Sequence, residues 1–230
     1  MNEFFQTSVF LGVFITLTAF GIGSFLKKRF KLAIFNPILI ATAIVIIVLL
    51  VFKIDYNTYK AGANYISYLL TPATIALAVP LYEKLELLKK NFTAVILGIL
   101  SGVLTSLCSV ALLSFIFKLD NKEYVTFLPK SITTAIGIVV SEELGGYAAI
   151  TVAVILITGV LGNMLAVTVC RVFKITEPIA KGIGIGSASH AIGTSKAMEI
   201  GEIEGAMSSL SIVISGILTV ILAPIFAQII

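Results

Sequence analysis

The sequence has few of the side chains on which most enzymes depend. It contains one histidine, two cysteines and no tryptophan, and only 12% of its residues are charged, where an ordinary soluble domain has about 25%. Both aspartates, Asp55 and Asp120, fall between apolar runs, which excludes an aspartyl dyad and a buried Ser-His-Asp triad. The sequence also has neither a phosphate-binding loop nor an HExxH motif. We therefore expect no enzymatic activity, no metal and no cofactor.

The cysteines and the first residues also exclude a secreted, disulfide-bonded domain. Cys108 and Cys170 lie within apolar runs, where we expect them to be packing residues. The opening residues, MNEFFQTSVF, carry an acid and no basic segment, and the apolar run that follows ends in Lys27, Lys28 and Arg29. This pattern predicts a first transmembrane helix in place of a cleavable signal.

Apolar residues dominate what is present. They make up 58% of the chain, and the mean hydropathy is +1.09. Runs such as 39–52 and 92–117 approach the roughly 20 residues that cross a hydrocarbon core. Open sheets cannot span lipid, so these runs predict an all-α polytopic membrane protein with 6–8 transmembrane segments. The net charge of +4 lies in short connections, so it reports membrane topology and not nucleic-acid binding.

The apolar segments suggest internal repetition. They cover residues 4–26, 32–52, 62–82, 92–117, 125–141, 147–170, 183–198 and 205–230. We expect a single integral membrane domain over 1–230. It would contain a helical hairpin over 1–60 and repeat-like units over 62–124, 125–175 and 182–230, each with a broken segment, a charged connector and a smooth helix. One interval separates Gly102 from Gly159 and Gly159 from Gly216, and it also places Pro72 over Pro129. Repeats built around discontinuous helices are typical of transporters.

Positive charge favours a re-entrant segment at 125–141. If every segment spans, the connections on the two sides hold similar numbers of basic residues. If 125–141 enters from outside and returns, Arg171, Lys174 and Lys181 join the cytoplasmic side, as the positive-inside rule prefers. Segments 125–141 and 183–198 would then enter from opposite faces as an inverted pair. Whether 125–141 spans the membrane or returns stays open at this point.

Lys130 is the first candidate for a binding residue. It lies in LPKSITTAIG, beside Ser131, Thr133 and Thr134. One interpretation is an interfacial lysine whose long stem lets the ammonium reach the headgroups. The other, which the neighbouring hydroxyls favour, is a cation beside a helix N-terminus that binds a small anion such as a carboxylate.

The second candidate region is the glycine-broken stretch GIGIGSASHAIGTSKAMEIGE, which holds His190, the only histidine. Polar side chains and irregular backbone are tolerated at membrane depth only where they pack against protein or line a watery cavity. His190 is either a packing residue or, as we prefer, part of a site with the residues Ser187, Ser189, Gly193 and Thr194. An imidazole can carry a coupled proton, and we add Glu142 and Glu199 as further coupling candidates.

These motifs resemble those of the LrgB/CidB family of bacterial inner-membrane proteins. The residues that carry the resemblance are TPATIALAVPLYEKLELLKK, LPKSITTAIGIVVSEELGG and GSASHAIGTSKAMEIGEIEGAMSSL. The resemblance implies a multi-pass protein of the bacterial plasma membrane with a small four-helix LrgA/CidA-type partner. It also implies two functions: holin- or antiholin-like modulation of murein hydrolase activity and cell lysis, or carboxylate transport, because a plastid relative is similar to a glycolate/glycerate carrier.

The broken helices and buried hydroxyls lead us to prefer a secondary transporter of small monocarboxylates such as pyruvate, glycolate or acetate, with a proton as the candidate coupling ion. Holin- or antiholin-like modulation of lysis is the alternative. We expect contacts with membrane lipid, the small partner and further copies of the chain, and none with nucleic acid. The predicted substrate-binding residues are Lys130, Ser131, Thr133, Thr134, Ser187, Ser189, His190, Gly193 and Thr194.

Overall fold

The chain forms α-helices in two compact units. A computed structural model describes residues 10–30 and 35–230, and this part of the chain contains no strand. The units are Met1–Ala76 and Leu77–Ile230. The predicted all-α fold is therefore confirmed for the described residues, whereas the division into a hairpin and repeat-like units stays a prediction. Lys31 and residues 4–9 and 32–34 of the predicted segments lie outside the described residues.

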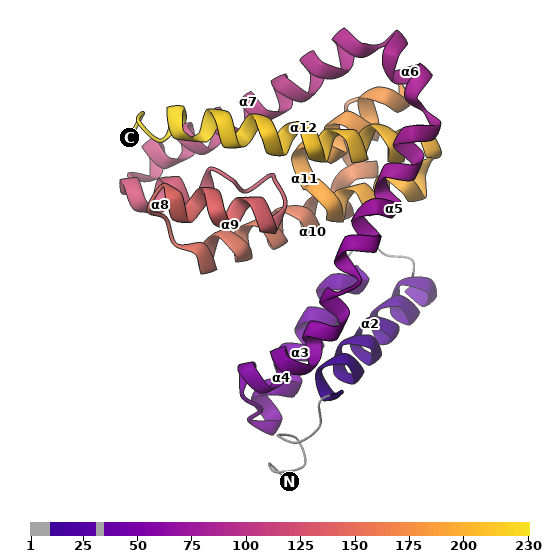
Figure 1. Cartoon of the computed structure of the whole chain (residues 1–230), viewed down its shortest axis with the longest axis vertical. Helices are drawn as coiled ribbons and strands as arrows, with labels where there is room; N and C mark the ends of the chain where they lie inside the picture. Colours follow the sequence, from indigo (N-terminus) through magenta and orange to yellow (C-terminus); the bar gives the residue numbers. More distant parts are fainter. Residues whose placement is uncertain (1–9, 31–34) are drawn as a thin grey trace. The chain divides into compact units, whose positions relative to one another are not determined.

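The smaller unit contains α2 (Leu11–Phe30), α3 (Pro37–Phe52), α4 (Tyr56–Ser67) and the start of α5 (Leu70–Glu83), as Figure 1 shows. Thr16 Oγ1 lies 2.8 Å from the Tyr59 hydroxyl, which joins α2 to α4. The predicted segment 62–82 is interrupted at Tyr68 and Leu69 and not at its prolines. Pro72 falls in the first turn of α5, where the missing N–H would have no helical partner in any case.

The larger unit contains the end of α5, then α6 (Leu85–Lys90), α7 (Phe92–Phe117), α8 (Asn121–Phe127), α9 (Thr134–Glu143), α10 (Ala148–Val172), α11 (Pro178–Ile200) and α12 (Glu202–Phe226). Among the described residues, α2, α7, α10 and α12 are long and apolar enough to cross a membrane. The other helices are shorter or interrupted.

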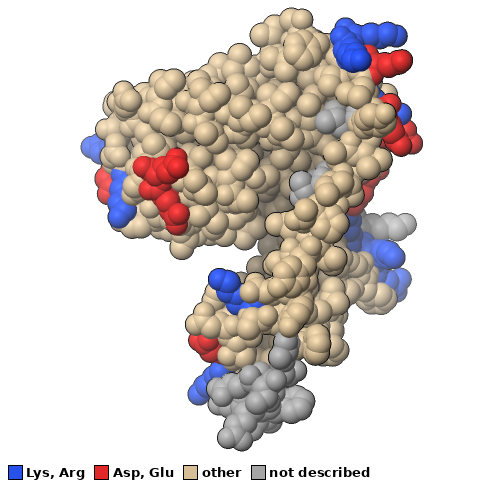
Figure 2. Space-filling view, in the orientation of Figure 1, with Lys and Arg blue, Asp and Glu red and all other residues tan. Residues whose placement is uncertain are grey.

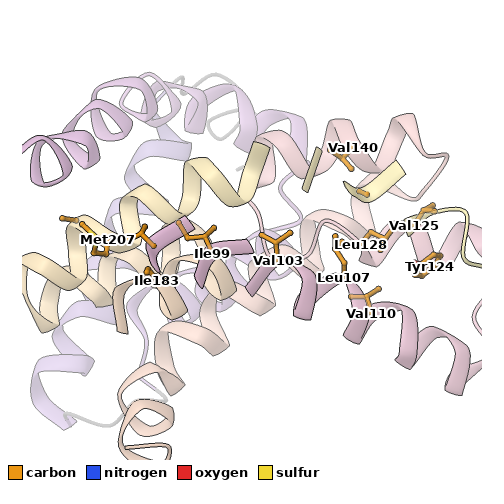
Figure 3. Close-up of a cluster of buried hydrophobic side chains, with 13 residues drawn as sticks. Ile99, Val103, Leu107, Val110, Tyr124, Val125, Leu128, Val140, Ile183 and Met207 are labelled. Carbon is orange, nitrogen blue, oxygen red and sulfur yellow. The ribbon is translucent and has the colours of Figure 1, made fainter. Parts of the chain in front are cut away.

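One face of α7 forms the spine of the core. Its residues Val95, Ile99, Val103, Leu107 and Val110 recur three or four positions apart, so they share a face of the helix. Figure 3 shows this row meeting side chains from four other helices and from the turn after α8, among them Tyr124, Val125, Leu128, Val140, Ile183 and Met207. Both α8 and α11 therefore pack against α7.

Three helices, α3, α7 and α10, end in the same way, at a lysine in a left-handed backbone conformation. Lys53, Lys118 and Lys174 have φ of 51°, 54° and 53°. In each case the next residue, an isoleucine or leucine, donates its N–H to a carbonyl five residues earlier, which is the Schellman arrangement. The sequence signal is FKID, FKLD and FKIT, and the sequence analysis missed it. The motif stops α3, α7 and α10 and turns the chain into the interrupted segment that follows.

The α8–α9 segment is a hairpin. Its helices are separated by non-helical residues 128–133. Tyr147, which precedes α10, donates its N–H to Thr126 Oγ1 at 2.8 Å, and Thr151 Oγ1 lies 3.0 Å from the Thr126 carbonyl oxygen. The chain has therefore returned to the end of the bundle where α8 starts. The Tyr124 hydroxyl donates to the Phe226 carbonyl at 2.8 Å, so α12 finishes at this end as well (Figure 1).

Helix α11 enters from the opposite end of the bundle and is bent back on itself at His190. His190 has φ 42° and ψ −141°, which breaks an otherwise helical segment. Before the bend, Gly182 approaches Met207 and the Glu204 backbone of α12; after it, Met198 packs against Gly205. Both arms therefore lie beside the first turns of α12. The predicted break in 183–198 is present, but it is confined to one residue.

Candidate functional site

The two interrupted segments both contact α7 near its middle. Ser131, in the α8–α9 break, has its hydroxyl 2.8 Å from that of Ser106 in α7. Ser187, just before the bend of α11, packs against Gly102 of α7. A Cβ added to Gly102 would lie 2.7 Å from Ser187 Oγ. Gly102 and Ser106 are one helical turn apart, about 6 Å along α7. The two interrupted segments therefore enter the bundle from opposite ends, and their breaks lie about one helical turn apart along α7.

The predicted residues around Lys130 are brought together by this break. Lys130 is half-buried, and its Nζ donates to Ser131 Oγ at 3.1 Å. Within residues 10–30 and 35–230 it makes no ion pair. Thr133 is the N-cap of α9 without a side-chain capping bond, and Thr134 is the first helical residue. A cation and the unpaired N–H groups of a helix start therefore lie side by side, which is an arrangement suited to an anion.

His190 is held in place on both sides. The residue is 3% exposed, and its Nε2 lies 3.0 Å from the Ile155 carbonyl oxygen in α10. A carbonyl oxygen can only accept, so Nε2 carries a proton in this arrangement. Gly159 faces the ring, because a Cβ there would lie 2.7 Å from Cε1. Thr194 Oγ1 donates to the His190 carbonyl oxygen at 2.9 Å, which stabilises the backbone after the bend.

The other predicted residues of α11 surround this bend. Ser187 donates to the Ile183 carbonyl oxygen of its own helix at 2.7 Å. Ser189 is buried against Gly162 of α10, and a Cβ on Gly193 would lie 2.5 Å from the Ser189 Cβ. The close approach of these backbones requires glycine, as expected from the sequence. Among the described residues, the Ser187 and Thr194 hydroxyls here donate to backbone carbonyl oxygens and so stabilise the fold.

The predicted acids do not join this cluster. Glu142 is exposed near the end of α9, and Glu199 lies 2.8 Å from Lys196 near the end of α11. They are at opposite ends of the bundle. Glu199 is nine residues from His190, about 13 Å along a helix. Their proposed part in coupling stays a prediction.

Several residues of the smooth helices were missed by the sequence analysis. Asn163 donates to the Ile192 carbonyl oxygen at 2.8 Å and to Ser195 Oγ at 3.1 Å. Ser208 lies 2.7 Å from Thr194 Oγ1. Together with Ser106 and Gly162, these residues of the long helices contact the interrupted segments. The available signal was a small or polar residue in the middle of a long apolar helix.

The described residues thus define a helical membrane protein in which two interrupted segments meet within a bundle of long apolar helices. The chain belongs to the LrgB-like family, whose model matches residues 16–229. It is 36% identical over 224 residues to "Antiholin-like protein LrgB" of Bacillus subtilis (strain 168), with 97% of each chain covered. It is also 36% identical over 221 residues to a protein of the same name from Bacillus mycoides (strain KBAB4), covering 94% of this chain and 95% of the relative. No solved structure matches this one. The resemblance stated from the sequence is confirmed.

Proposed function

We propose that this chain is an antiholin-like protein that modulates murein hydrolase activity and lysis from the bacterial plasma membrane. The observation that carries this proposal is the match to relatives of that name over 97% of the chain, breaks and long helices included. The proposal changes the preference reached from the sequence, because none of the relatives named above is called a transporter. A small LrgA/CidA-type partner and self-association belong to the same proposal. No catalytic step is involved.

The membrane arrangement that we infer has α7, α10 and α12 as spans, with α8–α9 and α11 as re-entrant segments from opposite faces. Its support is the return of both segments to the end from which they start. In the larger unit, basic residues concentrate at the end where α11 enters, namely Lys84, Lys89, Lys90, Arg171, Lys174, Lys181 and Lys196. Figure 2 shows charged side chains at two ends of this unit, with an uncharged belt between them. The positive-inside rule makes the α11 end cytoplasmic.

A carrier of small monocarboxylates is the second candidate, favoured by the setting of Lys130. A carboxylate would bind Lys130 Nζ, the N–H groups at the start of α9 and the Ser131 and Thr133 hydroxyls. His190, at the bend of α11, would hold or release a proton as the coupled ion. Oppositely directed hairpins that meet at mid-depth are the usual scaffold for alternating access. Carboxylate and proton fluxes would in turn alter the conditions for lysis, so this candidate would explain a lysis phenotype too.

The deciding experiment measures lysis and flux with the same variants. Wild type, Lys130→Gln and a matched control, Lys118→Gln at the end of α7, are expressed in a bacterium lacking its own LrgB-like protein. Detergent-induced autolysis and murein hydrolase activity are recorded. The same proteins are reconstituted into proteoliposomes, with and without the small partner. Uptake of labelled pyruvate, glycolate and acetate is then measured under a pH gradient.

The proposed function predicts that wild type and both variants change autolysis equally, with no saturable uptake. Saturable uptake that is lost only in Lys130→Gln would establish the carrier and its site instead. A wild-type protein that alters neither autolysis nor uptake would contradict both candidates.

A further inference from the structure

Two neighbouring cavities lie on the larger unit between α10 and α11, with volumes of about 380 Å³ and about 270 Å³. Both are lined by Cys170, Ile175 and Lys181, so we treat them as one groove. The first lies at the end of the bundle where α11 enters. The second continues inward as far as Gly162 and Ser189, beside the bend.

The outer end of the groove is basic. Arg171, Lys174 and Lys181 all line the first cavity. The turn after α10 fixes the backbone at Lys174, which adopts the left-handed conformation, and Ile175 donates its N–H to the Cys170 carbonyl oxygen at 2.8 Å. Glu204 offsets part of this charge, with its Oε1 3.9 Å from Lys181 Nζ. The local charge remains positive, since Arg171 and Lys174 make no ion pair with any residue that the structure describes.

The inner part of the groove is aliphatic and open to the side. Ala180, Gly184 and Ala188 line it from α11, and Leu165 and Val169 line it from α10. Leu165 is 50% exposed and Val169 43% exposed, so their side chains face the bundle exterior. A Cβ on Gly184 would meet no atom within 4 Å. This mainly aliphatic lining suits an alkyl chain and offers little to a small polar solute.

We propose that this groove binds an anionic phospholipid. The phosphate lies against Arg171, Lys174 and Lys181, and one acyl chain follows the aliphatic lining towards Ser189. Charge complementarity selects this occupant, because a zwitterionic lipid or an apolar partner helix would leave the basic cluster without a counter-charge. Basic pockets between helices on the cytoplasmic side are a known setting for acidic headgroups. The end that carries the groove is the one that the positive-inside rule makes cytoplasmic.

The test uses the purified full chain in dodecyl maltoside and titrates dioleoyl-phosphatidylglycerol. Thermal unfolding is followed by the loss of the monodisperse peak in size-exclusion chromatography after heating. Bound lipid is detected by native mass spectrometry. We expect a saturable rise in Tm and a retained lipid. Dioleoyl-phosphatidylcholine and inorganic phosphate serve as the zwitterionic and free-anion comparisons, and neither should reproduce the shift.

Two sets of variants locate the lipid. Arg171→Gln with Lys174→Gln and Lys181→Gln should weaken the apparent affinity about tenfold or more, while Lys118→Gln with Lys122→Gln at the other end should not. Ala188→Leu fills the aliphatic part and should abolish the shift with every cation in place, which keeps the test valid if the triple variant does not fold.

Three results would overturn the proposal. An equal shift with phosphate alone would identify a free-anion site, and an equal shift with phosphatidylcholine would indicate unspecific solvation by lipid. A change of oligomeric state in Ala188→Leu, with the lipid shift retained, would assign the groove to a second copy of the chain.

Discussion

At the scale of single residues, the interrupted helices can pack closely against the smooth helices because glycine occupies the points of contact. Gly162 admits Ser189 so closely that an added Cβ would collide with the serine hydroxyl, and Gly159 does the same for the His190 ring. Gly184, two residues after Gly182 on α11, faces open space. Glycines of one helix therefore differ in role, although they look alike in the sequence.

Gly162→Ala should destabilise the protein by about 1–3 kcal/mol, because overpacking against Ser189 must push the α11 bend outward. The matched control is Gly184→Ala, which adds the same methyl group where nothing lies within 4 Å. Thermal unfolding in detergent measures both. Adding Ser189→Gly to Gly162→Ala should restore much of the loss, and equal stabilities of the two single variants would contradict the packing that we describe.

His190 has a strained backbone conformation and a side chain that hydrogen-bonds to Ile155. A non-glycine residue in a sparsely populated backbone region costs about 1–3 kcal/mol, and His190 has φ 42°. His190→Gly loses the bond to Ile155 but relieves this strain, whereas His190→Ala loses the bond and keeps the strain. We expect a lower Tm for the alanine variant than for the glycine variant. The reverse order would mean that the bend is absent in the folded protein.

At the scale of elements, the return of the α8–α9 hairpin depends on Thr126. Its Oγ1 donates to the Lys122 carbonyl oxygen at 2.7 Å and accepts the Tyr147 N–H at 2.8 Å. Its carbonyl oxygen lies 3.0 Å from Thr151 Oγ1. A single buried threonine therefore ties the start of the hairpin to the start of α10.

Thr126→Val keeps the shape of the side chain and removes the acceptor for the Tyr147 N–H. This hydrogen bond is only partly buried, so its loss should cost about 0.5–1.5 kcal/mol and lower the Tm. Thr105→Val is the control, because Thr105 is exposed and bonds only within its own helix, to Ser101 at 2.7 Å. Equal Tm values for Thr126→Val and the wild type would show that the hairpin does not close through Thr126.

At the scale of the whole molecule, both hairpins return within the larger unit, so the proposed re-entrant arrangement predicts that Lys122 and Lys174 lie on opposite faces of the membrane. Single cysteines at these exposed positions, in a background of Cys108→Ser and Cys170→Ser, report the faces directly. An impermeant maleimide should label Lys122→Cys in intact cells and Lys174→Cys only in inverted vesicles. Labelling of both positions from one side would contradict the re-entrant arrangement.

The candidate site was partly predictable from the sequence, for a physical reason. Charged and hydroxyl side chains in an apolar chain are costly to bury, so Lys130 and His190 were visible as exceptions. Their partners Ser106, Gly162 and Asn163 were not, because small and weakly polar residues are common in apolar helices. The coupling acids Glu142 and Glu199 were proposed without knowledge of the fold, which places them at opposite ends of the bundle.

The composition and hydropathy pattern by themselves determined the class of the protein, since backbone groups in lipid must be satisfied within helices. The motifs determined the family. Only the tertiary structure decided that α8–α9 and α11 turn back, because a turn in mid-bundle is fixed by contacts with distant helices, such as those of Thr126 with Tyr147 and Ser131 with Ser106. It also decided which glycines are packed, because a missing Cβ matters only where another chain segment occupies its place.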